Sequence, residues 1–191
     1  MHSIAVLTIN GKRENEEDLV KIIEDASSYF PAETWDHIKY IGRLGLEHDF
    51  KVAKNREAYG AFLFQRLISR IKEIRNRNRL MNLLLGVTAD PIVAVYPFFD
   101  GTGFKNALYL VHDYVDERAG VVSFFRVDEE FSNKLVAHGL GHNRGLCHHL
   151  EPIDLMYSEL LSTSILRVNG FCEVCLRKLT KEETDAPTHT H

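Results

Sequence analysis

Four histidines lie within a short stretch near the C-terminal end of the sequence, and they are its most informative feature: His138, His142, His148 and His149. His138 and His142 are four residues apart, so on a helix their imidazoles lie on one face, one turn apart. Gly145 follows, and glycine accepts the positive φ that ends a helix and turns the chain back. His148 can then reach the same point in space from the other side.

This spacing predicts a metal site with three imidazole ligands. Neutral imidazole nitrogens bind zinc well, and three protein ligands leave the fourth tetrahedral position open. An open position is typical of a catalytic zinc rather than a structural one. The alternative is three unrelated histidines, and it explains neither the spacing nor the glycine at the expected helix end.

Cysteine usage indicates a second site. The chain has three cysteines, Cys147, Cys172 and Cys175, and an odd number in a reducing compartment argues against a disulfide framework. Cys172-x-x-Cys175 is then a zinc or a redox motif. No thioredoxin-like βαβ pattern surrounds it, so we prefer zinc.

Composition excludes several classes of function. The chain of 191 residues is 45% hydrophobic and 26% charged, as in ordinary globular proteins. Its net charge of -4 gives no basic field that would attract nucleic acid, and the arginines between Arg66 and Arg79 are read as a solvated helix face. The apolar run at residues 4–9 is too short for a signal peptide, and no stretch reaches the ~18–20 apolar residues of a membrane span. We expect a cytoplasmic monomer without nucleic-acid or membrane partners.

The elements that must position these residues follow from hydrophobic periodicity. Amphipathic helices are predicted over residues 15–29, 57–77 and 128–140, with a helical stretch near 175–178. Strands are predicted over 4–9, 83–87, 92–96, 107–112 and 121–127. Ser132 is a candidate N-cap of the histidine-bearing helix. Asp100-Gly101-Thr102-Gly103 lacks the pattern of a phosphate loop and predicts a turn between strands.

The segment His138-x3-His142-x2-Gly145-x2-His148 resembles the metzincin signature H-E-x-x-H-x-x-G-x-x-H. Met156 lies eight residues after His148, where metzincins carry the methionine of the Met-turn beneath the zinc.

The resemblance narrows to the archaemetzincin family of zinc metallopeptidases. That family follows its third histidine with two further cysteines, the methionine and a Cys-x-x-Cys. Here His149 and Asp154 stand at the first two cysteine positions, and Cys172-Glu173-Val174-Cys175 fits the closing motif. Residues 85–90 and 121–126 resemble the family's strands before the active-site helix.

The resemblance implies an α/β (α+β) metzincin-like zincin fold. Such a fold has a mixed twisted sheet, backing and active-site helices, and a small irregular C-terminal lobe. We expect a single domain over residues 1–191. Its upper lobe would span 1–143, its lower lobe 144–180, and a flexible tail 181–191.

The resemblance also implies two zinc ions. The first would be held by the three histidines, with Met156 beneath it. The second would be held by His149, Asp154, Cys172 and Cys175. Two alternatives stay open: Cys147 could replace His149, or the second site could have decayed to free thiols.

Position 139 departs from the family pattern. The family places there the glutamate that takes a proton from the zinc-activated water, whereas this chain has Gly139. General-base catalysis is worth about 10²–10⁴ in rate, so we expect peptidase activity on a peptide or protein substrate to be impaired or absent. Glu151 and Tyr157 are candidate replacement bases by proximity in sequence. The alternatives are an inactive, zinc-binding pseudoenzyme that binds peptides, and a structural zinc protein.

Overall fold

A computed structural model describes residues 2–11, 16–54, 56–150, 152, 154–158, 160 and 168–184. The strands are β1 (Ser3–Ile9), β2 (His37–Leu44), β3 (Phe50–Lys54), β4 (Glu57–Leu63), β5 (Leu83–Thr88), β6 (Ile92–Phe99), β7 (Phe104–Leu110), β8 (Asp113–Val115) and β9 (Ala119–Ser123). The helices are α1 (Glu16–Ser27), α2 (Phe64–Arg77), α3 (Glu129–Asn143) and α4 (Glu173–Thr184).

A five-stranded mixed sheet forms the centre of the molecule, in the order β2-β1-β5-β9-β8. The first four strands run parallel, and β8 pairs antiparallel with β9 at one edge. The two central strands β1 and β5 are buried almost throughout. Their near-continuous apolar sequences are what parallel strands covered on both faces require.

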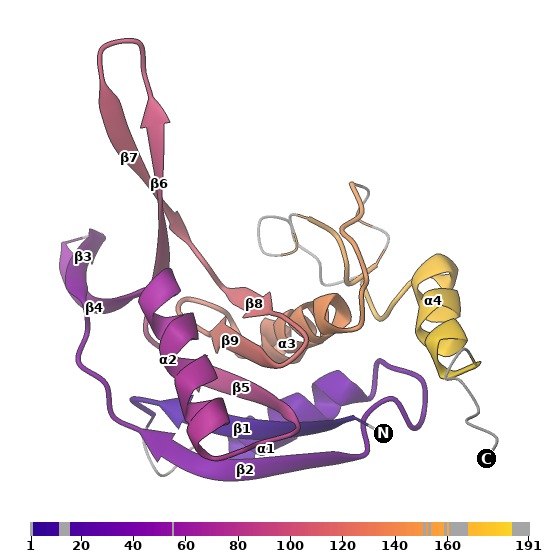
Figure 1. Ribbon diagram of the computed structural model, residues 1–191. Helices are drawn as coiled ribbons and strands as arrows, with labels where there is room; N and C mark the ends of the chain where they lie inside the picture. Colours follow the sequence, from indigo (N-terminus) through magenta and orange to yellow (C-terminus); the bar gives the residue numbers. More distant parts are fainter. Residues whose placement is uncertain are drawn as a thin grey trace.

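Helices cover both faces of this sheet (Figure 1). Along β1, Ile4 and Val6 join the core beneath α1 and α3, while Ala5 and Leu7 join the core beneath α2. This alternation follows from the two-residue period of a strand. The α1–α3 side also receives buried residues of the C-terminal segment, so that segment is anchored to the same core.

A second sheet has the order β3-β4-β6-β7. Its β6–β7 hairpin projects from the rest of the molecule (Figure 1). The hairpin carries exposed aromatic side chains, including Phe99 and Phe104 near its tip. The turn predicted at residues 100–103 is confirmed as the connection between its strands.

The predicted α/β fold class is confirmed, but three local predictions are wrong. The strand predicted over residues 121–127 ends at Ser123. Residues 57–63 form strand β4 rather than the start of a helix, because the chain stays extended through Leu63 and becomes helical only at Phe64. Ser132 is not an N-cap. Helix α3 begins at Glu129 after the extended residue Asp128, and Ser132 lies one turn inside.

The structure adds elements that periodicity did not predict: β2, β3 and β8. The division into lobes and the tail remain predictions, and residues 185–191 lie outside the described part of the chain. Within that described part, no helix has the length and apolar content needed to cross a membrane.

Candidate metal centre

Helix α3 ends as the sequence predicts, at a left-handed glycine. Gly145 has a φ of 75°, and its N–H donates to the carbonyl of His142. The N–H of Leu146 reaches back to the carbonyl of Gly141 at 3.0 Å. These two bonds form a Schellman motif, and the turn that they fix brings His148 back towards the helix.

The three predicted histidines converge through their Nε2 atoms. Nε2 of His148 lies 2.9 Å from Nε2 of His142 and 3.1 Å from Nε2 of His138. Two nitrogens bound to one tetrahedral zinc at 2.0–2.1 Å are about 3.3 Å apart. The donor set and its spacing therefore fit one zinc ion after a movement of a few tenths of an ångström.

The local environment favours the neutral form of two of these imidazoles, His142 and His148. Nδ1 of His142 lies 3.0 Å from the carbonyl oxygen of Leu146, which can only accept, so Nδ1 carries the proton and Nε2 keeps its lone pair. Burial lowers the pKa of His142, and the neighbouring His138 lowers it further. Burial and His138 also lower the pKa of the His148 imidazole. Neutral imidazole is the form that binds a metal.

An open pocket of about 800 Å³ surrounds the histidines. Edge strand β8 and the residues before it form one wall, and Ser158 and Leu160 lie on the other side. Strand β8 lies beside α3 (Figure 1). Since β8 ends the sheet, its outer backbone groups are available to an extended peptide.

Asp113 on β8 reaches the first histidine. Its Oδ2 lies 3.1 Å from Nδ1 of His138, and the side chains are 12% and 9% exposed. The distance is that of a hydrogen bond, although the buried Nδ1 does not meet the angular criteria for one. A small rotation of the carboxylate would bring its oxygen into line with Nδ1. Sequence reasoning missed this residue, since nothing in the local pattern marks it.

Gly139 faces β8. A Cβ at position 139 would lie 2.9 Å from Cγ2 of Val115 and 3.2 Å from Oδ2 of Asp113. Glycine inside a helix costs about 1 kcal/mol relative to alanine. The close approach of the strand gives a physical reason for bearing that cost here. A glutamate at this position would need both neighbours to move.

Met156 packs against the underside of the same helix. It is fully buried, and a Cβ at Gly141 would lie 2.5 Å from its sulfur. The helix can therefore rest on this methionine only if position 141 has no side chain. Met156 therefore contacts the helix at Gly141, the residue directly before the candidate ligand His142.

A second group of side chains surrounds His149. Nε2 of His149 lies 3.1 Å from Sγ of Cys175, 3.7 Å from Sγ of Cys172 and 3.3 Å from Oδ2 of Asp154. Sulfur and nitrogen ligands of one tetrahedral zinc are about 3.5 Å apart. The four residues of the predicted second site thus come together in a geometry that fits an ion.

The backbone holds this group in place. His149 forms a bridge with Tyr157, and its N–H donates to the carbonyl of Met156. Asp154 accepts from the backbone N–H groups of Met156 and Cys172. Burial alone would raise the pKa of Asp154, but these hydrogen bonds outweigh it and lower the pKa, so the carboxylate is ionised.

Burial raises the pKa of the Cys175 thiol well above its usual value, and the neighbouring Asp154 adds to this effect. The thiol is therefore protonated unless a cation is present to stabilise the thiolate. Cys147 is exposed and lies outside this four-residue group.

Only one of the two candidate replacement bases, Tyr157, lies in the described part of the chain. Tyr157 is buried in the core, and the described residues on that side of the histidine pocket are Ser158 and Leu160. Glu151 lies outside the described residues.

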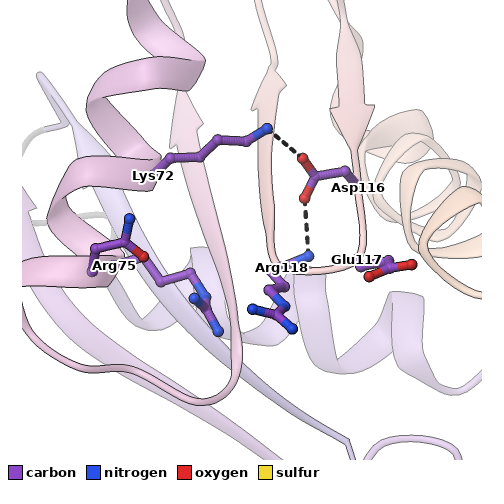
Figure 2. Close-up of a pocket in the computed structure, with 6 residues that line it drawn as sticks. Lys72, Arg75, Asp116, Glu117 and Arg118 are labelled. Atoms are coloured by element: carbon purple, nitrogen blue, oxygen red, sulfur yellow. Dashed lines mark hydrogen bonds and ion pairs between the residues drawn. The ribbon is translucent and has the colours of Figure 1, made fainter.

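A different pocket lies between α2 and the β8–β9 turn (Figure 2). Two of its charged groups pair with each other, Lys72 and Asp116 at 2.7 Å, and Asp116 also accepts the backbone N–H of Arg118. Among the described residues around it there is no group of metal ligands, so the histidine pocket is the better candidate site.

Solved structures of archaemetzincins and of a zinc-dependent peptidase share the fold of this chain. The archaemetzincin of Methanopyrus kandleri matches with a TM-score of 0.61 and 23% sequence identity over 96% of both chains. A zinc-dependent peptidase from Methanocorpusculum labreanum matches with a TM-score of 0.56 and 17% identity, over 92% of this chain and 99% of the other.

The archaemetzincin of Archaeoglobus fulgidus, complexed with malonate, matches with a TM-score of 0.57 and 17% identity over the same shares of the two chains. No protein-family model and no curated protein matches the sequence. The chain therefore has an archaemetzincin-like fold, as its motifs predicted.

Proposed function

We propose that the chain is an archaemetzincin-like zinc metallopeptidase whose rate is severely reduced by the loss of the general base at position 139. The observation that carries this proposal is the convergence of three Nε2 atoms at the wall of a pocket bordered by a free strand edge. His138, His142 and His148 are the proposed ligands of this zinc. Met156 takes the place of the Met-turn methionine beneath it.

Different residues of this chain have different roles in the proposed peptide hydrolysis. The three imidazoles hold the ion, and the backbone of β8 binds an extended peptide by strand addition. A zinc ion in this position polarises a carbonyl group and acidifies water. The proton-accepting carboxylate is the missing part, because Gly139 has no side chain.

His149, Asp154, Cys172 and Cys175 are proposed to hold a second zinc ion. Its role is structural, because all four tetrahedral positions are taken by protein atoms. Ions at both sites, a peptide or protein substrate, a monomeric state and a cytoplasmic location remain predictions.

A second candidate function is a pseudoenzyme that binds peptides without cleaving them. It is favoured by the close approach of Val115 and Asp113 to Gly139, because a side chain at that position would have to displace both of them. The third alternative, a purely structural zinc protein, requires that only the cysteine-containing site holds metal.

Metal analysis combined with a peptidase assay separates these functions. The purified protein is expected to contain two zinc ions, and the His138→Ala/His142→Ala variant is expected to contain one. An unchanged zinc content would reject the histidine site and both functions that depend on it.

A slow cleavage of a mixed peptide library, absent in the double variant, supports the impaired peptidase. The same zinc loss with no cleavage in either protein supports the pseudoenzyme. Cleavage at ordinary enzyme rates would contradict the role assigned to the missing glutamate.

A further inference from the structure

Asp113 and His138 are joined across two elements that are distant in sequence. Asp113 begins edge strand β8, and His138 lies in the buried middle of α3. Their contact, Oδ2 to Nδ1 at 3.1 Å, is among side chains that are about nine-tenths buried. A carboxylate in such surroundings interacts strongly with an adjacent ring nitrogen, because little water screens it.

The contact is on the side of the imidazole that faces away from the proposed ion. Nε2 of His138 points to Nε2 of His148, whereas Nδ1 points to Asp113. The imidazole ring therefore separates the carboxylate from the nitrogen that would bind the ion. Asp113 therefore acts on the ligand and does not replace the missing base.

A carboxylate at Nδ1 has a defined effect on a histidine ligand. It holds the proton on Nδ1, leaves the lone pair on Nε2, fixes the ring orientation and makes Nε2 a stronger donor. His142 receives the same kind of support from the carbonyl of Leu146. Both helical ligands then have an acceptor at Nδ1. For His138 it is the carboxylate of Asp113 on β8, and for His142 it is the carbonyl of Leu146 after the helix end.

Gly139 makes the approach of this strand possible. Its place in α3 does not require glycine for a positive φ, because the positive-φ glycines described are Gly42, Gly101 and Gly145. A Cβ there would instead lie 3.2 Å from Oδ2 of Asp113 and closer still to Val115. Side-chain atoms at position 139 and the carboxylate of Asp113 compete for one space.

We propose that Asp113 is a positioning residue for the metal ligand His138. The absence of a side chain at Gly139 leaves the space in which Asp113 reaches that histidine. This inference rests on the proposed function, because it needs zinc at the three histidines. The departure from glutamate at position 139 is then coupled to a carboxylate on β8. The site lacks the glutamate side chain at position 139, and its ligand His138 is supported by Asp113.

Zinc affinity of the full-length protein tests the proposal, measured by competition with a chromophoric chelator. Asp113→Asn keeps the shape of the side chain and is expected to weaken binding at the histidine site about tenfold, and Asp113→Ala up to about a hundredfold. Asp116→Asn is the matched control. It removes the same charge just after the same strand but contacts Lys72 rather than a histidine, and its zinc affinity should equal that of the parent.

The tautomer of His138 gives a second readout that a merely structural role would not move. Nitrogen NMR of the zinc-free protein should show the proton on Nδ1 in the parent and a mixture of tautomers in Asp113→Asn. If Asp113→Ala fails to fold, Asp113→Asn decides alone.

Zinc affinities of the Asp113 variants within threefold of the parent would overturn the proposal. An unchanged zinc content in His138→Ala/His142→Ala would instead overturn the proposed function, so the two failures are distinguishable.

Discussion

Met156 lies so close to Gly141 that a single added carbon atom would overlap its sulfur, at 2.5 Å. The contact joins the C-terminal segment to the helix that carries two of the proposed ligands. Met156 is fully buried and belongs to the core that α1, α3 and the central sheet share. The position of the histidine pair is therefore tied to the packing of this one methionine.

Substituting Gly141→Ala should destabilise the protein. In an open helix the change would stabilise by about 1 kcal/mol, but overpacking of a close contact costs about 1–3 kcal/mol. We expect a net loss in urea unfolding. Gly103→Ala is the control, since a Cβ there meets nothing within 4 Å. A Gly141→Ala variant that is more stable than the parent would mean that Met156 moves aside freely.

Restoring the glutamate should require a second change. In Gly139→Glu the new side chain overlaps Val115, a branched residue with few alternative rotamers. Gly139→Glu/Val115→Ala removes that overlap, and its cleavage rate should rise by about 10²–10⁴ over the parent. The single variant should gain less and unfold more easily. Peptide cleavage at saturating zinc measures both, and equal rates in the two variants would contradict the steric argument.

Thiol labelling should distinguish the cysteines of the second group from Cys147. Cys147 is exposed, so it should react with iodoacetamide with or without zinc. Cys172 is half-buried and should react only after chelation, because a metal-bound thiolate is protected. Cys175 should react slowly in both states, since burial raises its pKa. Mass spectrometry of the labelled peptides measures each rate, and labelling of Cys172 that ignores the chelator would argue for a decayed site.

The Lys72–Asp116 pair should give a pH-dependent contribution to stability. Burial alone would raise the pKa of Asp116, but its bonds to Lys72 and to two backbone N–H groups lower it below the unfolded value. Its stabilisation is therefore present above the unfolded pKa of about 3.9 and is lost as the pH falls through the lower, folded pKa.

At pH 7 the free energy of unfolding of Asp116→Asn should be about 1 kcal/mol or less below that of the parent, as for a partly exposed ion pair. The difference should begin to shrink below about pH 4 and vanish once the pH is below the lower, folded pKa of Asp116. Urea unfolding across this range, at low and high salt, makes the measurement. A gap that does not shrink at all as the pH falls below about 4 would assign the loss to packing instead of charge.

The features of the site that were predicted correctly from the sequence come from residues that are close together in the chain. His138, His142, Gly145 and His148 belong to one helix and its end, so periodicity and one glycine rule were sufficient. The members of the second group are separated by up to 26 residues. Only the resemblance to archaemetzincins brought them together before the structure did.

Non-local features were not predictable in this way. Asp113 comes from a strand of three residues, too short for any periodic signal. Residues 57–63 continue into the helical pattern of α2, so their extended form depends on pairing with β3 and β6. Strand β2 alternates between half-buried and exposed residues and carries several charges, a pattern that is also typical of a loop. Its extended form depends on pairing with β1.

The adjacency of His148 and His149 has a consequence for how the protein would fill with metal. One metal site would close a loop of 6 residues from His142 to His148, and the other a loop of 26 residues from His149 to Cys175. The two loops meet at a single peptide bond. The conformational entropy of that bond is lost when the first ion binds, and it is not lost again when the second ion binds. The first ion to bind would therefore lower the cost of binding the second, and partly loaded molecules should be scarce.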